Sequence, residues 1–171
     1  MLKRNCLFLR NCISIPFTLV MIIACNTDEV CDENTITNVV ASFYTTVDNR
    51  VVDTTAMVTS IIAVNDSMSI LYESEDAVQS VSFPLNNSLD SCAVIMDFTL
   101  YDTIPKPDTL YFTDTLTFFY NIELIMESIE CGFVHYFHLQ SINWTDNFIE
   151  DVEIVNPAVT TREYENIKIL Y

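Results

Sequence analysis

The stretch that decides the fold runs from Thr115 to Met126 and reads TLTFFYNIELIM. In an extended chain every second side chain lies on the same face. One face of this stretch is then wholly apolar or aromatic, and it consists of Leu116, Phe118, Tyr120, Ile122, Leu124 and Met126. The other face mixes polar Thr117, Asn121 and Glu123 with Phe119 and Ile125. A period of two over this length predicts a β-strand with one buried face, and not a helix.

Similar short alternating segments recur roughly every ten residues from about residue 37 to the end of the sequence. We expect strands at 38–45, 55–64, 68–73, 78–84, 91–100, 109–113, 115–126, 132–140, 150–155 and 165–171. No segment shows the sustained 3.6-residue period of an amphipathic helix. The fold class is therefore predicted as all-β, an antiparallel β-sandwich that is immunoglobulin-like in the broad sense, with a closed β-barrel as the alternative.

The turns between these segments are built almost without glycine, since the chain contains only one. Asn and Asp adopt the left-handed backbone conformation more readily than other side chains do. Pairs of these residues stand between expected strands, at Asp48-Asn49, Asn65-Asp66, Asn86-Asn87 and Asp146-Asn147. We expect tight connections there, and a loop marked by Pro105 and Pro107.

Length and composition indicate one acidic globular domain. The chain has 171 residues, 50% of them hydrophobic and 18% charged, which excludes a disordered tail and a coiled coil. Its formal charge is -17, and three of its 7 cations lie within the first ten residues. A chain that starts at Cys25 would carry 4 cations against 24 acids. Because so acidic a body is repelled by phosphate backbones, nucleic acid is excluded as a partner.

The first 24 residues are typical of a secretory signal peptide. A basic start is followed by an apolar run from about Cys12 to Ala24, which is interrupted by Pro16 and too short to span a bilayer. The run ends in Ile22-Ile23-Ala24-Cys25, which resembles the bacterial lipobox, where a small residue precedes the Cys that receives the lipid. We therefore predict a lipid anchor on Cys25. The alternatives are an ordinary signal peptide with a chance Cys, and an N-terminal membrane anchor.

The residues after Cys25 bear on the location of the protein. Asn26 stands where an Asp would resemble an inner-membrane retention signal, and Asp28 and Glu29 resemble the surface-export signals of Bacteroidota lipoproteins. We expect the outer membrane, and the side of it that the protein faces stays open. The expected organisation is a lipoprotein signal peptide at 1–24, an acidic tether at 25–36 and a β-sandwich domain at 37–171.

Three cysteines follow the lipidated one: Cys31, Cys92 and Cys131. Cys92 belongs to the apolar alternation of residues 92–100, and we interpret it as a small buried hydrophobic residue. Cys31 and Cys131 lie in polar, turn-like surroundings, and in an oxidising compartment we expect them to form a disulfide. No pair is spaced as CxxC and no His stands at zinc-ligand spacing from a Cys, so no metal site is expected.

Motifs of catalysis are missing from the sequence. His135 and His138, its only histidines, point to opposite faces of a strand and so cannot share one metal ion. The sequence contains no nucleophile elbow, phosphate-binding loop or zinc-protease motif. We therefore expect neither an enzyme nor a cofactor.

Candidate binding residues are also open to simpler interpretations. Acidic clusters at 28–33, 73–76 and 150–153 lack the pattern of an EF-hand loop and are interpreted as solvated surface, with Ca²⁺ binding left open. Trp144 and Tyr111 are candidates for a sugar-stacking platform, although packing is the simpler interpretation. Asp-Ser/Thr pairs resemble the O-glycosylation pattern of exported Bacteroidota proteins, and they stand at Asp53-Thr54, Asp66-Ser67, Asp102-Thr103, Asp108-Thr109 and Asp114-Thr115.

Several short motifs follow one another along the mature chain. In order they are Cys25 and Cys31, Phe43-Tyr44, Phe83-Pro84-Leu85-Asn86, Asp114-Thr115-Leu116, Ser128-Ile129-Glu130-Cys131-Gly132-Phe133 and Ile167-Lys168-Ile169-Leu170-Tyr171. This order resembles a family of uncharacterised Bacteroidota cell-envelope lipoproteins, a domain of unknown function with an early Cys and a Cys-Gly-Phe step. Leu170 departs from the family's terminal strand by one residue. The resemblance implies no catalytic or binding residues, supports the pair of Cys31 and Cys131, and implies a need for backbone freedom at Gly132.

The function expected from the sequence is that of a non-enzymatic structural or binding module, attached to the outer membrane through the lipid on Cys25. The alternative is an accessory surface lipoprotein that binds a glycan or an ion. A protein or glycan partner is not identified by the sequence.

Overall fold

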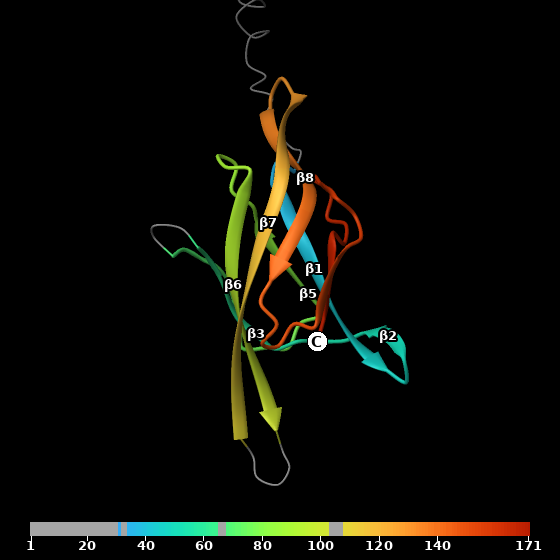
Figure 1. Ribbon diagram of the computed structural model, residues 1–171. Coiled ribbons are helices and arrows are strands. Elements are labelled where there is room, and N and C mark those ends of the chain that lie inside the picture. Colours follow the sequence, from blue (N-terminus) through green and yellow to red (C-terminus); the bar gives the residue numbers. More distant parts are fainter. Residues whose placement is uncertain (1–30, 32–33, 65–67, 103–107) are drawn as a thin grey trace, which may run out of the picture. The chain divides into compact units, whose positions relative to one another are not determined.

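Eleven β-strands are present within the part of the chain that the computed structural model describes, which is Cys31 and residues 34–64, 68–102 and 108–171 (Figure 1). The strands form two sheets, and no helix is present among these residues. The all-β prediction is therefore confirmed.

The first sheet has five strands and is built around β1 (Asn38–Val47). β11 (Ile167–Leu170) lies between β1 and β9 (Asp151–Ile154). β5 (Ser80–Pro84) pairs with the first half of β1, and β2 (Arg50–Asp53) pairs with its second half. β5 and β2 thus pair with different halves of the same strand, β1.

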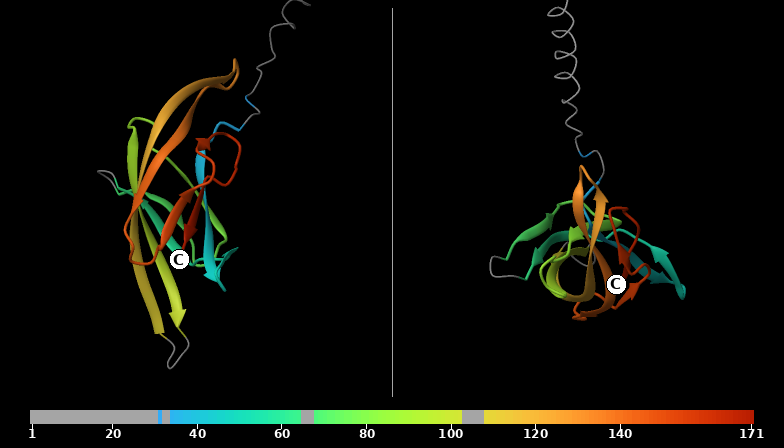
Figure 2. Two further views of the ribbon diagram at one scale, coloured as in Figure 1. Left: turned by 45° about the vertical axis from the view of Figure 1, so that its right-hand side comes forward. Right: turned by 90° about the horizontal axis from the view of Figure 1, so that it is seen from above.

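The second sheet has six strands in the order β10-β8-β7-β6-β3-β4, and every pair in it is antiparallel. Its members are β3 (Val58–Ala63), β4 (Ile70–Glu73), β6 (Ser91–Asp102), β7 (Asp108–Ser128), β8 (Gly132–Trp144) and β10 (Ala158–Val159). The pairs β6–β7 and β7–β8 are long hairpins that run through the middle of this sheet (Figure 2).

The connections β2–β3 and β4–β5 each lead from one sheet to the other. They meet at an isolated bridge between Ala56 and Val78, where each backbone N–H donates to the other residue's carbonyl oxygen at N···O distances of 2.9 and 2.8 Å. Ala56 is buried and belongs to the hydrophobic core. The bridge therefore links the two sheets through the backbone at one corner.

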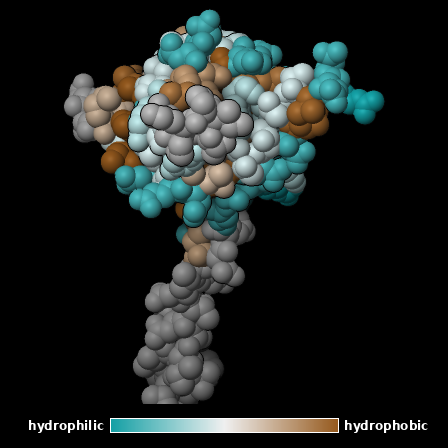
Figure 3. Space-filling view, turned by 90° about the horizontal axis from the view of Figure 1, so that it is seen from below, coloured by the Kyte–Doolittle hydropathy of each residue, from teal (hydrophilic) through white to brown (hydrophobic). Residues whose placement is uncertain are grey.

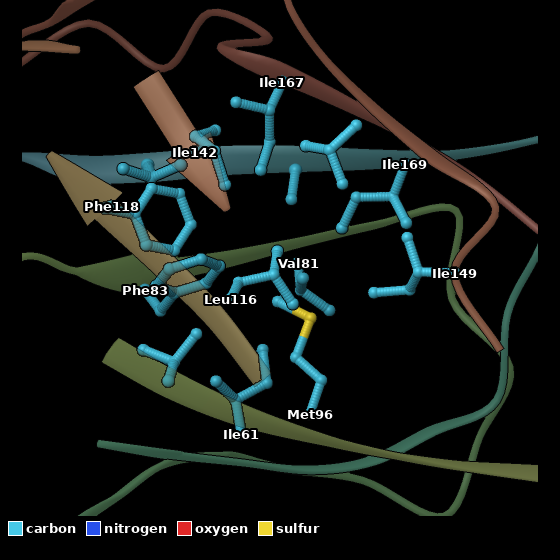
Figure 4. Packing of buried hydrophobic residues seen from close by; sticks show 14 of the residues in the cluster. Ile61, Val81, Phe83, Met96, Leu116, Phe118, Ile142, Ile149, Ile167 and Ile169 are labelled. Atoms are coloured by element: carbon cyan, nitrogen blue, oxygen red, sulfur yellow. The ribbon is translucent and has the colours of Figure 1, made fainter. Parts of the chain in front are cut away.

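The buried faces of the two sheets share one hydrophobic core, which makes the arrangement sandwich-like (Figure 4). In the close-up, Met96 of the second sheet points toward Val81 of the first sheet, and Phe118 lies against Phe83, with ring centroids 5.7 Å apart. The alternation read from the sequence gives these buried positions directly, since every second residue of β1, β6 and the middle of β7 is buried.

Bulges shift this alternation at two places. The register of β3 against β6 shifts between Val58 and Ser60, which allows Val58 and Ile61 to be buried although they are three residues apart. The register of β8 against β7 shifts in the same way, and it allows both Leu139 and Ile142 to face the core. A strict period of two does not predict either pair.

Three details of the predicted strands are wrong. Residues 109–113 and 115–126 are not two strands but one, the 21-residue β7, because Asp114 stays in the ladder opposite Met96. β2 and β10 are absent from the predicted strands, because no residue of β2 is buried and β10 has only 2 residues, so neither shows an apolar alternation. The remaining expected strands are present with shifted ends.

The topology also differs from a purely antiparallel sandwich. β1 and β11 are parallel, with Ala41 opposite Ile167 and Phe43 opposite Ile169. The side chains of β11 would be buried equally well whether the strand ran parallel or antiparallel to β1. The alternation therefore does not predict the relative direction of the two strands. The alternative of a closed barrel is not formed by the described strands, which make two separate open sheets.

One of the predicted tight turns is confirmed, and two others are wrong: Asn86-Asn87 and Asp146-Asn147 lie in the longer connections β5–β6 and β8–β9, and none of these four residues has a positive φ. Asp48 and Asn49 have φ angles of 51° and 59° and connect β1 to β2 in two residues, as a mirror-image hairpin turn requires. Gly132 has a φ of 72°, which agrees with the backbone freedom expected of it. Asn65-Asp66 and the loop of Pro105 and Pro107 lie outside the described residues.

The signal peptide at 1–24 and Cys25 also lie outside the described residues. Of the proposed tether at 25–36, Asn34 contacts the domain, because its side-chain Nδ2 donates to the carbonyl oxygen of Thr161 at 2.9 Å. Among the residues that the structure describes, none belongs to a helix long and apolar enough to cross a membrane.

Candidate functional site

The hairpin β7–β8 continues beyond the strands that flank it (Figures 1 and 2). β6 pairs with β7 only as far as Phe119, whereas β8 pairs with β7 as far as Ser128. Among the strands that the structure describes, only β8 therefore pairs with the last nine residues of β7. Their side chains lie on a two-stranded ribbon, whose faces need cover from elsewhere if they are apolar.

One face of this ribbon continues the hydrophobic core. Near its base Tyr120 and Phe137 are buried, with ring centroids 5.4 Å apart. Further out the same face carries Leu124 and Met126, each 54% exposed, and Phe133, which lies opposite Met126 and is 63% exposed. Ile129, in the connection between the strands, is 84% exposed. We call residues 124–133 the hairpin end.

On the opposite face, Asn121, Glu123 and His138 are exposed near the base of the ribbon, whereas the side chains further out are buried or half-buried. Val134 is buried there, and the Tyr136 hydroxyl donates to Glu127 Oε2 at 3.1 Å. The same hydroxyl lies 3.2 Å from Oγ1 of Thr161, in the connection between β10 and β11. The face that remains open on the hairpin end is therefore the apolar one.

The connection at the hairpin end is held in a defined shape. The Cys131 backbone N–H donates to Ser128 Oγ at 3.0 Å, and Gly132 follows in the left-handed conformation. Cys131 is disulfide-bonded, as is Cys31, whereas Cys92 is the free thiol among the cysteines that the structure describes. Both cysteines are therefore oxidised, as the disulfide that the sequence predicts between Cys31 and Cys131 requires.

Cys92 packs as the sequence analysis expects. It lies opposite Phe118 in the ladder between β6 and β7, and it is a half-buried member of the layer against the core. Burial, and then contact with Cys92, raises the pKa of Tyr120, whose hydroxyl donates to the carbonyl oxygen of Asn86 at 2.8 Å. Cys92 thus fills space beside a buried tyrosine.

The two histidines do not come together. His135 is half-buried and lies opposite Leu124 on the apolar face, whereas His138 is exposed on the other face. His138 Nδ1 lies 3.0 Å from Gln140 Nε2. Within the described ranges no group of three or more His, Cys, Asp and Glu side chains could hold a metal ion, and the acids of 73–76 and 150–153 are exposed.

The two candidates for sugar stacking separate in the structure. Trp144 is half-buried and packs against the core, whereas Tyr111 is 77% exposed on the outward face of the second sheet. Tyr101 is also exposed on that face, and Asp97 beside them accepts hydrogen bonds from Ser60 and Thr113, both at 2.7 Å. Seen from below, hydrophobic side chains form separate areas between hydrophilic ones (Figure 3).

The sequence analysis considers Asp114 only within short motifs and misses its role as a buried carboxylate with four hydrogen bonds. It is fully buried, and it accepts bonds from the Thr145 hydroxyl at 2.6 Å and from the backbone N–H groups of Asn147, Phe148 and Ile149 at 3.0, 2.8 and 2.9 Å. Burial alone would raise the pKa of this carboxyl, but the four hydrogen bonds outweigh it and lower the pKa.

The role of Asp114 is structural: it holds the connection between β8 and β9. The loop places Phe148 among Phe98, Phe112 and Tyr171, with ring centroids 4.7 to 5.1 Å apart. A signal for this site was present in the sequence, because Asp114 is the one acid on an otherwise apolar face between Phe112 and Leu116. An acid at such a position implies hydrogen-bonding partners from another segment.

Residues 55–171 match the model of a family of unknown function (DUF6452). The matched segment begins between β2 and β3 and ends at the last residue, so it includes Asp114 and the whole hairpin β7–β8. No curated protein and no solved structure matches the chain.

Proposed function

The chain belongs to the family of unknown function DUF6452, and from this premise we propose that it is a lipid-anchored protein of the bacterial cell envelope. Its role is that of a non-enzymatic structural or binding module at the outer membrane, in a bacterium of the Bacteroidota. The domain is an immunoglobulin-like β-sandwich in the broad sense, carried by an acidic tether behind the lipidated Cys25.

The observation that carries this proposal is the sequence Ile22-Ile23-Ala24-Cys25 at the end of the apolar run. A thiol is the side chain that accepts a diacylglycerol thioether, and the small Ala24 suits a peptidase that cuts before the Cys. The disulfide-bonded state of Cys31 and Cys131 supports export, because disulfides persist in oxidising compartments. The acidic composition supports a soluble domain outside the lipid.

Intact mass of the protein made in a bacterium that processes lipoproteins tests the anchor. We expect a mature species that begins at Cys25 and carries a diacylglyceryl-sized increment. The matched control is Cys25→Ser, which should stay unprocessed and lack the increment. A mature wild-type chain that begins at another residue, or that has no lipid increment, would overturn the proposal.

A second function, accessory glycan binding, is favoured by one observation. Tyr101 and Tyr111 expose their rings on the same outward face, beside the hydrogen-bonded Asp97. Exposed aromatic rings offer stacking surfaces, and neighbouring hydroxyl and carboxyl groups offer hydrogen bonds. Glycan-array binding that Tyr111→Ala abolishes, and that Phe119→Ala on the same strand face leaves intact, would support this function; no binding by wild type would exclude it.

A further inference from the structure

We propose that the hairpin end rests on the lipid surface that holds the anchor, with Leu124, Met126, Ile129 and Phe133 in contact with lipid. This inference rests on the proposed function, since it needs the lipid on Cys25. It adds a second attachment to the membrane, made by the folded domain itself. The protein then stands on the bilayer in one orientation, with the hairpin β7–β8 directed toward it.

The apolar composition of the open face is the first argument. The exposed side chains of the hairpin end lie on one face or in the connection, and the covered face carries Glu127 and Tyr136 instead. Large apolar side chains that project from a two-stranded end are costly to leave in water. A lipid interface accepts such side chains to a shallow depth.

The position of the disulfide-bonded cysteines is the second argument. Cys131 lies two residues from both Ile129 and Phe133, and its expected disulfide partner is Cys31. Cys25 precedes Cys31 by only six residues, which span at most about 20 Å when fully extended. With the pair joined, the hairpin end cannot move far from the lipid anchor.

This short link decides between lipid and other occupants of the apolar face. A group held within about 20 Å of a surface meets it at an effective concentration on the order of millimolar. A few apolar side chains are then sufficient for contact, although they would not bind membranes on their own. A second copy of the chain has no comparable advantage.

Charge decides the kind of lipid. The hairpin end contains Glu127 and Glu130, and residues 108–161 contain no Lys or Arg. An anionic surface would repel these acids, since neither β7 nor β8 carries a Lys or Arg that offsets them. The surface that fits is therefore zwitterionic, as phosphatidylcholine or phosphatidylethanolamine is.

Fluorescence quenching in vesicles tests the contact. The full mature chain, lipidated at Cys25, is reconstituted in phosphatidylcholine vesicles whose acyl chains carry bromine. Trp144→Phe removes the single native Trp, and Ile129→Trp or Phe133→Trp places the reporter on the hairpin end. Val51→Trp on β2, an exposed apolar position of the first sheet, is the matched control.

We expect bromine to quench Trp at 129 and 133 at least threefold more than Trp at 51. Reduction of the disulfide should lower the quenching at 129 while the protein still floats with the vesicles. If Trp144→Phe prevents folding, the same comparison is made with Trp144 retained and its quenching subtracted. Equal quenching at all three positions in floating protein would overturn the inference alone.

Two further outcomes separate this inference from its premise. Protein that does not float with the vesicles would overturn the lipid anchor, and the inference falls with it. Protein that floats, shows no lipid quenching at 129, and cross-links to a second copy through that position would show that another chain covers the hairpin end. Either result contradicts lipid contact.

Discussion

At the scale of single residues, Asp114 shows how one buried carboxylate shapes a loop. Its four hydrogen bonds come from residues 31 to 35 positions away, and they fix the start of the segment that leads into β9. A buried acid is costly unless it is hydrogen-bonded, and this one is bonded at both oxygens. The loop and the strand therefore depend on one another.

We predict that Asp114→Asn lowers the free energy of unfolding by about 2–4 kcal/mol, because the amide nitrogen cannot accept the bonds made by Phe148 and Ile149. Denaturant unfolding measures the change. Asp146→Asn, an exposed position in the same loop, is the control and should change stability little. A loss of similar size in both variants would contradict the role given to Asp114.

The lowered pKa of Asp114 also has a consequence for acid stability. A carboxyl whose pKa is lower in the folded state stabilises the protein above its unfolded pKa of about 3.9, and this stabilisation is lost as the pH falls through the folded pKa. Wild type should therefore lose this contribution below about pH 4. Asp114→Asn should show a smaller acid-dependent loss in parallel melts over that range.

Gly132 is the second residue whose backbone decides a local structure. Its φ of 72° is unfavourable for a residue with a Cβ, while no atom lies within 4 Å of where that Cβ would stand. We predict that Gly132→Ala lowers stability by about 1–2 kcal/mol through backbone strain alone, and that Gly132→Asn costs less. Equal stability of the Ala variant and wild type in denaturant unfolding would contradict this.

At the scale of elements, β11 shows that a short terminal strand holds the first sheet together. It lies between β1 and β9, and Ile167 and Ile169 are fully buried. Tyr171, just after it, stacks on Phe148 with ring centroids 4.7 Å apart and donates from its hydroxyl to the carbonyl oxygen of Thr55 at 2.7 Å. Tyr171 thus contacts both the connection β8–β9 and the connection β2–β3.

We predict that deletion of residues 167–171 abolishes cooperative folding, because it exposes two core positions and leaves facing edges of β1 and β9 without a partner. Thermal melts followed by near-ultraviolet circular dichroism measure this. Tyr171→Phe is the control: it keeps the ring and loses one hydrogen bond, at a cost of about 1 kcal/mol. A cooperative melt of the truncated chain would disprove the role of β11.

At the scale of the whole molecule, the expected disulfide between Cys31 and Cys131 ties the start of the chain to the hairpin end. Closing a loop of about 100 residues stabilises a protein by roughly 4–5 kcal/mol in the chain-entropy account. We predict that Cys31→Ser combined with Cys131→Ser lowers Tm clearly. Cys92→Ala should act as a modest truncation beside the core.

Peptide mapping under non-reducing conditions checks the pairing on which this prediction depends. The expected result is a single cross-linked peptide pair that contains Cys31 and Cys131, with Cys92 recovered as a free thiol. A cross-link to Cys92, or three free thiols in oxidised protein, would show the assignment to be wrong.

The sequence alone was sufficient for the all-β class, for most strands, and for the Asp48-Asn49 turn. Each of these depends on neighbours along the chain: the alternation of 115–126 is visible without knowing what covers it. Three further features could be predicted from the sequence for the same reason. They are the backbone freedom at Gly132, the turn-like surroundings of Cys131, and the packing of Cys92 as a free thiol.

Only the tertiary structure decided which strands and side chains lie next to one another. The parallel pairing of β1 with β11 joins residues 126 positions apart, and nothing in either segment records the direction of the other. The continuity of β7 through Asp114 depends on donors from the loop after β8, which supply the bonds that a buried carboxylate needs. The exposure of the apolar face of the hairpin end could not be predicted from the alternation either, because Leu124 and Met126 continue the same apolar alternation as the buried residues of β7. Alternation marks which side chains are apolar, but burial is decided by how far the neighbouring strands extend.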